Sequence, residues 1–213
     1  MNRFLLAIIT VLLFQNQAQS QSTETPKFEV AAEFTTLERE EFGRRRTEPG
    51  IGARFTFNLN RIVSLETAGY FFPKKCFGCA NGGNVTEVLG GVKVGKRFEH
   101  WGIFGKARPG VVSFSRGKFN VVPNPNIPAF PFEFVPDRLN SFAADVGGVV
   151  EFYPSKHLVT RFDAGDTIIH FGKRPVQVIT FDSATSTFSL VPFTLPARTT
   201  HNFQFMASVG WRF

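Results

Sequence analysis

The stretch Phe203-Gln-Phe-Met-Ala-Ser-Val-Gly-Trp-Arg-Phe213 places an apolar or aromatic residue at every second position. Successive side chains of a β-strand point to opposite faces, so a period of two is typical of a strand with one apolar face. The aromatic side chains Phe203, Phe205, Trp211 and Phe213 share that face, and the other face is mostly polar or small. The pattern predicts the closing strand of a membrane barrel.

The rest of the chain has the composition of an all-β protein. Its 213 residues include 27 Phe but only two Tyr and two Trp, together with 19 Gly. Alternation of the same kind predicts strands over residues 28–36, 51–59, 62–72, 85–98, 102–114, 141–153, 158–170 and 203–213. Each has roughly the 9 to 11 residues that cross a bilayer when tilted.

Short and long connections alternate between these strands, as in an outer-membrane barrel with tight periplasmic turns and long outer loops. We therefore predict an eight-stranded antiparallel up-and-down transmembrane β-barrel. A soluble lipocalin-like barrel would instead hide its apolar face and expose its charges to water.

The charged residues decide which face of each strand meets lipid, because Arg or Lys on the lipid face near the midplane costs roughly 2 to 4 kcal/mol. The predicted interior charges are Glu29, Glu33, Arg54, Glu66, Glu87, Lys93, Lys106, Arg108, Asp145, Glu151, Arg161, Asp163 and Arg212. The predicted lipid-facing residues are Phe28, Val30, Phe34, Ala53, Phe55, Phe57, Leu65, Phe71, Val92, Val94, Ile103, Phe142, Val146, Val150 and Phe162.

The N-terminal segment has the pattern of a secretory signal. Arg3 precedes an apolar stretch over residues 4–14, and the small-x-small pattern Ala18-Gln-Ser20 follows. We predict a signal peptide over residues 1–20, cleaved on export, and a barrel domain over residues 21–213. The apolar stretch is too short for a membrane-spanning helix, which needs about 20 residues.

The chain resembles the small outer-membrane β-barrels of Gram-negative bacteria, such as the transmembrane domain of OmpA and OmpX-like proteins. Hairpin stretches over residues 52–60 and 95–105, the signal segment and the terminal Phe213 carry the resemblance. It implies an integral outer-membrane monomer among outer-membrane lipids and lipopolysaccharide. It also implies that Phe203, Phe205, Trp211 and Phe213 form the signal read by the barrel-assembly machinery.

The interior of an eight-stranded barrel is just wide enough for side chains to fill. The charges can therefore form a salt-bridged plug, which we favour, or line a narrow porin-like channel. We expect a non-enzymatic protein whose long outer loops serve surface interaction or envelope integrity. A lipid-modifying enzyme using Ser155 and His157 is the less favoured alternative, because that pair lies in a turn without an orienting carboxylate.

The remaining motifs favour no cofactor and no metal. Cys76 and Cys79 lie in an outer loop, where oxidising conditions favour a local disulfide over a redox or metal site. His170 and His201 could face each other on neighbouring strands, but zinc needs three or four ligands. The net charge of +7 fits anionic lipid head groups, and without a basic run interleaved with aromatics it does not predict nucleic-acid binding.

The third and fourth outer loops are long and apolar, so a partner protein could bind there. The third contains Phe residues between prolines, and the fourth contains two alternating runs, residues 176–181 and 187–193. The runs predict a hairpin that extends the last two barrel strands. That hairpin could fold over the mouth as a lid, offer an edge to a partner strand, or make the barrel ten-stranded.

Pro109 interrupts the fifth predicted strand. A proline removes one donor from the hydrogen-bond ladder and is normally confined to edges and bulges. We therefore predict a bulge or a strand end at this position.

Overall fold

The computed structural model describes residues 25–41, 44–73, 83–126, 130–184 and 186–213. It contains the strands β1 (Phe28–Glu41), β2 (Arg44–Asn58), β3 (Val63–Phe72), β4 (Val85–Arg97), β5 (Trp101–Pro123), β6 (Phe132–Phe152), β7 (Leu158–Phe171), β8 (Arg174–Asp182), β9 (Thr187–Leu195) and β10 (Arg198–Arg212). No helix in the described ranges is long and apolar enough to span a membrane.

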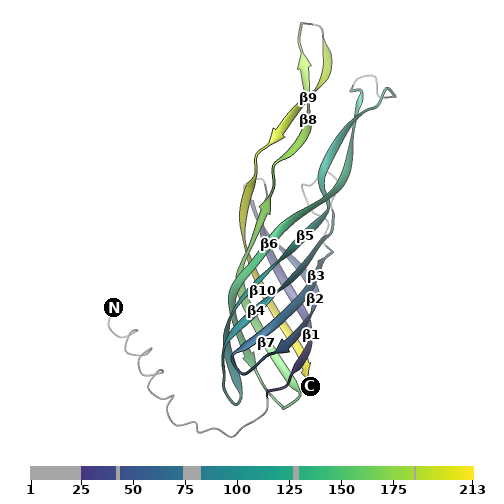
Figure 1. Ribbon diagram of the computed structural model, residues 1–213. Coiled ribbons are helices and arrows are strands. Elements are labelled where there is room, and N and C mark those ends of the chain that lie inside the picture. Colours follow the sequence, from purple (N-terminus) through teal and green to yellow (C-terminus); the bar gives the residue numbers. More distant parts are fainter. Residues whose placement is uncertain (1–24, 42–43, 74–82, 127–129, 185) are drawn as a thin grey trace.

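Eight of these strands close into one antiparallel barrel in the order β1-β10-β7-β6-β5-β4-β3-β2 (Figure 1). The strands β8 and β9 pair only with each other. The predicted eight-stranded barrel is therefore confirmed, and the ten-stranded alternative is wrong. The closing contact is the β1–β10 ladder, in which Glu29 lies opposite Arg212 and Leu37 opposite Gln204.

The two ends of the barrel differ. The tight links over residues 59–62, 98–100 and 153–157 lie at the end of the barrel where the C-terminus is marked in Figure 1. We call this the inner end. The opposite, outer end carries all the long connections. This is the predicted alternation of short and long links.

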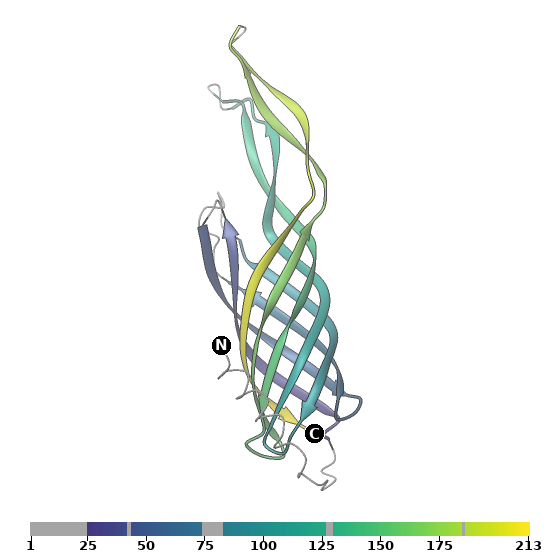
Figure 2. The ribbon, with the colours of Figure 1, turned by 90° about the vertical axis from the view of Figure 1, so that its left-hand side faces the viewer.

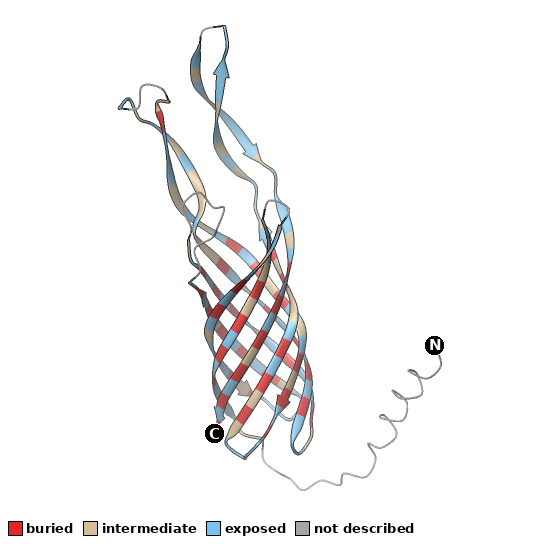
Figure 3. Ribbon diagram, turned by 180° about the vertical axis from the view of Figure 1, so that it is seen from behind, coloured by how far each residue is buried: buried red, intermediate tan, exposed pale blue. Residues whose placement is uncertain are grey.

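Burial alternates along every barrel strand, as the bands of colour in Figure 3 show. Most side chains that point outward along the middle of the barrel are apolar, and none of the predicted lipid-facing residues is buried. Charged side chains point into the lumen. The apolar surface is thus on the outside, an arrangement that is favourable in a membrane and unfavourable in water.

Pro109 forms neither a bulge nor a strand end, so that prediction is wrong. It lies inside β5, in register with Ala144 of β6. The ladder with β4 lacks the pairs between Leu89–Gly110 and Val92–Ala107 but keeps the same register on either side. The missing donor of the proline is therefore accommodated by a local gap in one ladder. The register shift of β5 lies instead between Phe114 and Lys118.

Two long ribbons rise from the outer end (Figures 1 and 2). The first ribbon, residues 115–126 and 130–139, continues β5 and β6 beyond their pairing with other barrel strands. The second ribbon, residues 174–195 without 185, consists of β8 and β9 and continues the direction of β7 and β10. The predicted hairpin is present, but it rises away from the barrel, so the lid alternative is wrong. The third outer loop is a paired ribbon and not an irregular loop.

Candidate functional site

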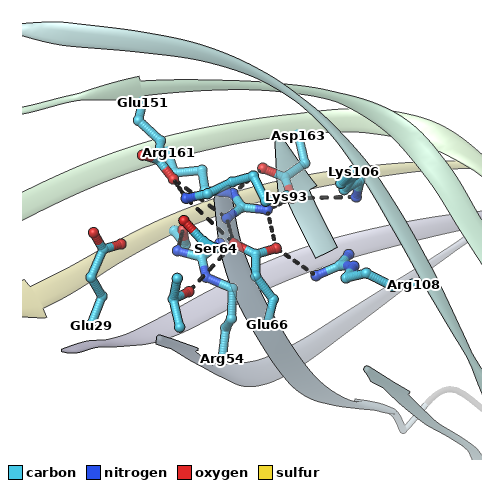
Figure 4. A network of polar contacts seen from close by, with 12 residues as sticks. Glu29, Arg54, Ser64, Glu66, Lys93, Lys106, Arg108, Glu151, Arg161 and Asp163 are labelled. Atoms are coloured by element: carbon cyan, nitrogen blue, oxygen red, sulfur yellow. Dashed lines mark hydrogen bonds and ion pairs between the residues drawn. The ribbon is translucent and has the colours of Figure 1, made fainter. Parts of the chain in front are cut away.

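The centre of the lumen is a network of ion pairs around Arg161 of β7 (Figure 4). Its guanidinium donates to both carboxylate oxygens of Glu66, at 3.1 Å for Nη2, and to Asp163 Oδ2 at 2.7 Å. Glu151 Oε1 lies 3.5 Å from Arg161 Nη1 and is also paired with Lys93. A second contact of Lys93, to Glu66 Oε1 at 3.4 Å, closes the circuit. Strands β3, β4, β6 and β7 thus meet through charged side chains across the lumen.

Toward the outer end the network continues through Lys106 and Arg108 of β5. Lys106 Nζ lies 2.8 Å from Asp145 Oδ2 and 3.3 Å from Asp163 Oδ2. Arg108 donates from Nε and Nη2 to Asp145 Oδ2, at 2.9 and 2.6 Å. Its Nη1 is 3.3 Å from the hydroxyl of Tyr70. Two basic side chains therefore share one carboxylate. The ion pairs run along the axis of the lumen as well as across it.

Arg54 and Glu33 form a pair on β2 and β1, at 2.6 Å between Nη1 and Oε1. The other oxygen of Glu33 accepts a hydrogen bond of 2.6 Å from the Tyr70 hydroxyl. Because Tyr70 also contacts Arg108, this pair is joined to the network. Charge-assisted hydrogen bonds are the strongest kind that a protein interior offers, and here each carboxylate has at least one.

The inner end is closed by a smaller cluster around Glu29. Its Oε1 lies 3.3 Å from Arg97 Nη2 and 3.4 Å from Arg212 Nε, and it accepts a hydrogen bond from Asn58 at 2.9 Å. The guanidinium of Arg212 stacks on the ring of Tyr153, 4.2 Å from its centroid. Burial, with the nearby carboxylate of Glu151, raises the pKa of the Tyr153 hydroxyl, which donates to Glu151 Oε2 at 2.8 Å.

Toward the outer end the interior contains an apolar cluster beside uncharged polar side chains such as Thr35, Thr167 and Gln204. The buried cluster there comprises Leu37, Ala68, Tyr70, Phe72, Val85, Leu89, Val112, Ala143, Ile169 and Met206, with Phe114 and Phe171 packed against it. One carboxylate, Glu87, lies among these side chains without a basic partner in the described residues. Gln204 donates to its Oε2 at 2.9 Å, and its Oε1 is buried without a hydrogen bond. An apolar layer thus lies above the ionic layer.

The lumen is sealed at the level of the network. Eight charged side chains form this part of the network, and each exposes at most 1% of its surface. They are Glu66, Lys93, Lys106, Arg108, Asp145, Glu151, Arg161 and Asp163. A water-filled path would give a water-sized probe access to the side chains that line it. The structure therefore has a filled barrel at this level, and the charges in it are balanced by neighbours and not by solvent.

All thirteen predicted interior charges lie in the lumen, and each is buried. Among the side chains that the structure describes, Glu48 and Arg97 are two further charged residues that are buried, and they were missed. Arg97 has the same odd-numbered register on β4 as Glu87 and Lys93, so the alternation itself could have found it. Glu48 belongs to a part of β2 that the sequence assigned to a loop.

The turn containing Ser155 and His157 is held by structural contacts. Ser155 Oγ accepts hydrogen bonds from the backbone N–H groups of His157 and Leu158, at 3.3 and 3.1 Å. The His157 ring stacks on Trp211 with 5.5 Å between centroids. Within the described residues no hydrogen bond joins the His157 ring to Ser155 Oγ, so the pair has turn geometry and not that of a nucleophile with its base.

His170 and His201 lie on the neighbouring strands β7 and β10, as predicted, but each has its own partner. His170 Nδ1 is 3.0 Å from Thr199 Oγ1, and His201 Nδ1 is 2.6 Å from Asp166 Oδ2. In the described part of the chain, no group of three His, Cys, Asp or Glu side chains could hold a metal ion.

Phe203, Phe205, Trp211 and Phe213 project outward from the end of β10 and are all exposed. The exposed apolar side chains on the outside of the barrel strands form what we call the apolar belt, and these four aromatic residues belong to it, which agrees with their predicted face. Cys76 and Cys79, and the predicted signal peptide, lie outside the described residues.

The tips of the two ribbons touch through aromatic rings. Phe130 of the first ribbon packs edge-on against Phe188 of the second, with 5.5 Å between centroids. Phe132 packs edge-on against Phe130, Phe134 stacks on Phe130, and Phe181 packs on Phe188 at 5.0 Å. The two ribbons therefore form one unit at their tips, which we call the aromatic clasp.

The fold is that of small outer-membrane β-barrels. Neisserial surface protein A superposes with a TM-score of 0.54, at 10% identity over 89% of this chain and 99% of that one. The attachment invasion locus protein Ail of Yersinia pestis, solved with the heparin analogue sucrose octasulfate, gives 0.52 at 10% identity over 89% and 100%. At this identity the likeness shows the fold alone. No protein-family model and no curated protein matches the sequence.

Proposed function

We propose that this protein is a non-enzymatic integral protein of the outer membrane, whose filled barrel is an anchor and whose two ribbons interact with the cell's surroundings. The single observation that carries the proposal is the contrast between the barrel lumen and the two ribbons. The lumen is closed by paired charges, whereas the ribbons expose large apolar side chains such as Phe134, Phe181 and Phe193. Exposed apolar groups of this kind mark interaction surfaces.

The belt supports the location. Its exposed side chains alternate with buried charges on every barrel strand, which suits lipid outside and a polar lumen inside. We infer that outer-membrane lipids and lipopolysaccharide surround it, that the protein is a monomer, and that residues 1–20 are a signal peptide removed on export. The aromatic series on β10 is proposed as the signal for the barrel-assembly machinery.

The likeness to Ail supports a binding role. That protein has the same fold and was solved with a ligand, the heparin analogue sucrose octasulfate. A barrel of this shape can therefore combine membrane anchoring with binding. For this chain the exposed edges of β8 and β9 offer hydrogen-bonding groups to an extended partner segment, the mode known as strand addition.

Planar-bilayer recording tests the filled barrel against the porin-like alternative. We expect the refolded protein, checked by the altered gel mobility of its unboiled form, to give no steady conductance steps, because no water path crosses the network. As a matched pair, Arg108→Gln and Glu66→Gln each remove one charge from the sealed layer. Steady steps in the wild type, with an amplitude that changes in either variant, would show a channel and refute the anchor proposal.

The aromatic clasp is tested by a substitution in the first ribbon and a measurement of amide exchange in the second. Replacing Phe130 by Ala removes the ring contact with Phe188 and leaves the sequence of the second ribbon unchanged. An aromatic pair contributes about 0.5–1.5 kcal/mol, so amide exchange over residues 187–191 is expected to accelerate about two- to tenfold. Hydrogen-exchange mass spectrometry of the folded protein measures this.

Phe119→Ala is the control, because Phe119 lies on the same ribbon and has no ring contact with the second one among the described residues. It should leave exchange in residues 187–191 unchanged. If both variants accelerate exchange equally, the ribbons are not coupled through the clasp.

A further inference from the structure

A pocket lies at the inner end of the barrel, beside the place where the first and last barrel strands meet. Its volume is about 630 Å³, which is within the range of small-molecule sites. Residues 25–28, 156–157 and 212–213 line it. They come from the start of β1, the link before β7 and the end of β10, and these three strands are neighbours in the barrel (Figure 1). None of the lining residues is acidic, and the set includes two lysines.

Backbone hydrogen bonds join the three segments that form this inner-end pocket. The Phe213 N–H donates to the Phe28 carbonyl oxygen at 2.9 Å. The Arg212 N–H donates to the His157 carbonyl oxygen at 2.8 Å. The His157 ring also contacts the end of β10, because its Nδ1 lies 3.3 Å from the Arg212 carbonyl oxygen. The pocket is therefore a fixed part of the barrel rim.

The two lysines, Lys27 and Lys156, lie on either side of the end of β10. The backbone of Lys27 is held by Asn58, whose N–H donates to its carbonyl oxygen at 2.8 Å. Because β1 and β7 both pair with β10, the two lysine backbones are about two strand spacings, or about 10 Å, apart. Both side chains are exposed and long enough to reach one ligand between them. Arg212 is paired with Glu29 at 3.4 Å, whereas neither lysine forms an ion pair with a described carboxylate.

One wall of the inner-end pocket is aromatic and continues the apolar belt. Phe28 and Phe213 lie on the outward face of their strands, with 42% and 64% of their surface exposed. Phe28 stacks on Phe57 at 5.3 Å, which fixes its ring. Trp211 lies on the same face of β10, and tryptophan prefers the boundary between hydrocarbon and head groups. The pocket thus lies at the inner edge of the belt, with an apolar wall and two cationic groups.

This combination suits a ligand that carries both a negative charge and apolar chains. We propose that the inner-end pocket binds an anionic glycerophospholipid of the inner leaflet, with its phosphate between Lys27 and Lys156 and the start of its acyl chains on Phe28 and Phe213. The inference rests on the proposed outer-membrane location. Basic pockets beside membrane-spanning segments bind anionic head groups by the same electrostatics. The ammonium group of phosphatidylethanolamine is repelled by the lysines, so phosphatidylglycerol is the preferred lipid.

Native mass spectrometry of the refolded protein, titrated with phosphatidylglycerol in detergent micelles, tests the proposal. Lys27→Gln and Lys156→Gln are each expected to weaken binding about fivefold, the effect of one basic residue near an anionic head group. Phosphatidylethanolamine should bind the wild type more weakly, and the difference between the two lipids should disappear in the double variant. Lys96→Gln is the control, because Lys96 lies at the same end of the barrel over the Phe98 ring and does not line the pocket. It should leave binding unchanged.

Glycerol 1-phosphate, which has the phosphate without acyl chains, distinguishes a lipid from a soluble ligand. Weak binding of this compound supports the lipid, because the aromatic wall then contributes to affinity. Binding as tight as that of phosphatidylglycerol, and equally dependent on Lys27 and Lys156, overturns the assignment to lipid and leaves a site for a soluble phosphate.

Three results overturn the pocket itself: unchanged phosphatidylglycerol binding in both lysine variants, an equal loss in Lys96→Gln, or no preference between the two lipids. An equal loss in Lys96→Gln would mean that the basic inner end attracts anionic lipid without a defined site. These results are distinct from failure of the proposed function. In that case the protein would not insert into vesicles or show the gel mobility of a folded barrel, whatever lipid is added.

Discussion

Replacing Arg161 by Met is expected to lower the free energy of unfolding of the barrel by about 3–5 kcal/mol, the effect of breaking a buried ion pair from one side. Arg161 contacts Glu66, Glu151 and Asp163, and all three carboxylates are sealed from water. The methionine fills a similar volume but leaves their negative charge without its principal partner. Urea-induced unfolding in lipid vesicles, followed by the fluorescence of the two tryptophans, measures the change.

Two further variants separate lost charge balance from lost packing. In the double variant Arg161→Met, Glu66→Met one uncompensated carboxylate is gone, so the destabilisation should be smaller than in Arg161→Met alone. Lys118→Met breaks the exposed pair with Asp137 in the first ribbon and should not move the unfolding midpoint detectably. If Arg161→Met behaved like Lys118→Met, water would have to reach the carboxylates, and the barrel would not be filled.

The interior charges were predictable because two independent constraints agree. Alternation assigns each strand residue to one of two faces, and the cost of a charge in lipid then selects which face is inside. Arg54 and Lys93, for example, each lie between apolar neighbours in the sequence, so only one register buries them in the lumen. Which charges pair could not be predicted. Glu66 meets Arg161 across the barrel, and that contact depends on the stagger of strands far apart in sequence.

The apolar layer at the outer end was not predicted for the same reason. Phe72 and Ile169 each lie on the inward face of a predicted strand, and Leu37 follows the first predicted strand. Only the registers of the closed barrel bring them to one level, where they form a single cluster.

Prolines explain why the first ribbon was assigned to a loop. Pro123 and Pro136 are unfavourable inside a sheet because they cannot donate to the ladder. In a two-stranded ribbon each strand has one edge free, so a missing N–H can face solvent at no cost. Pro136 lies opposite Phe119 in the ribbon, and Pro49 lies in a part of β2 that extends beyond its pairing with β3. The sequence signal for a loop and the signal for a free edge are identical at such positions.

The apolar belt itself is open to a direct test by placing a charge at its middle. Ala207 lies midway between Trp211 and Phe203 on the outer face of β10 and is directly opposite Phe162 of β7. Ala207→Arg is expected to destabilise the barrel in lipid vesicles by about 2–4 kcal/mol, because a lipid-facing arginine at the midplane must be drawn from water into hydrocarbon. Ala184→Arg makes the same change at the exposed tip of the second ribbon and should leave the unfolding midpoint unchanged. Equal stability of the two variants would mean that the outer face of β10 does not contact lipid. Loss of stability only in Ala207→Arg would place the midplane of the bilayer at the level of the Arg161 network. The layer with the most buried charge inside the barrel would then lie at the same height as the lipid layer that is least able to accept a charge.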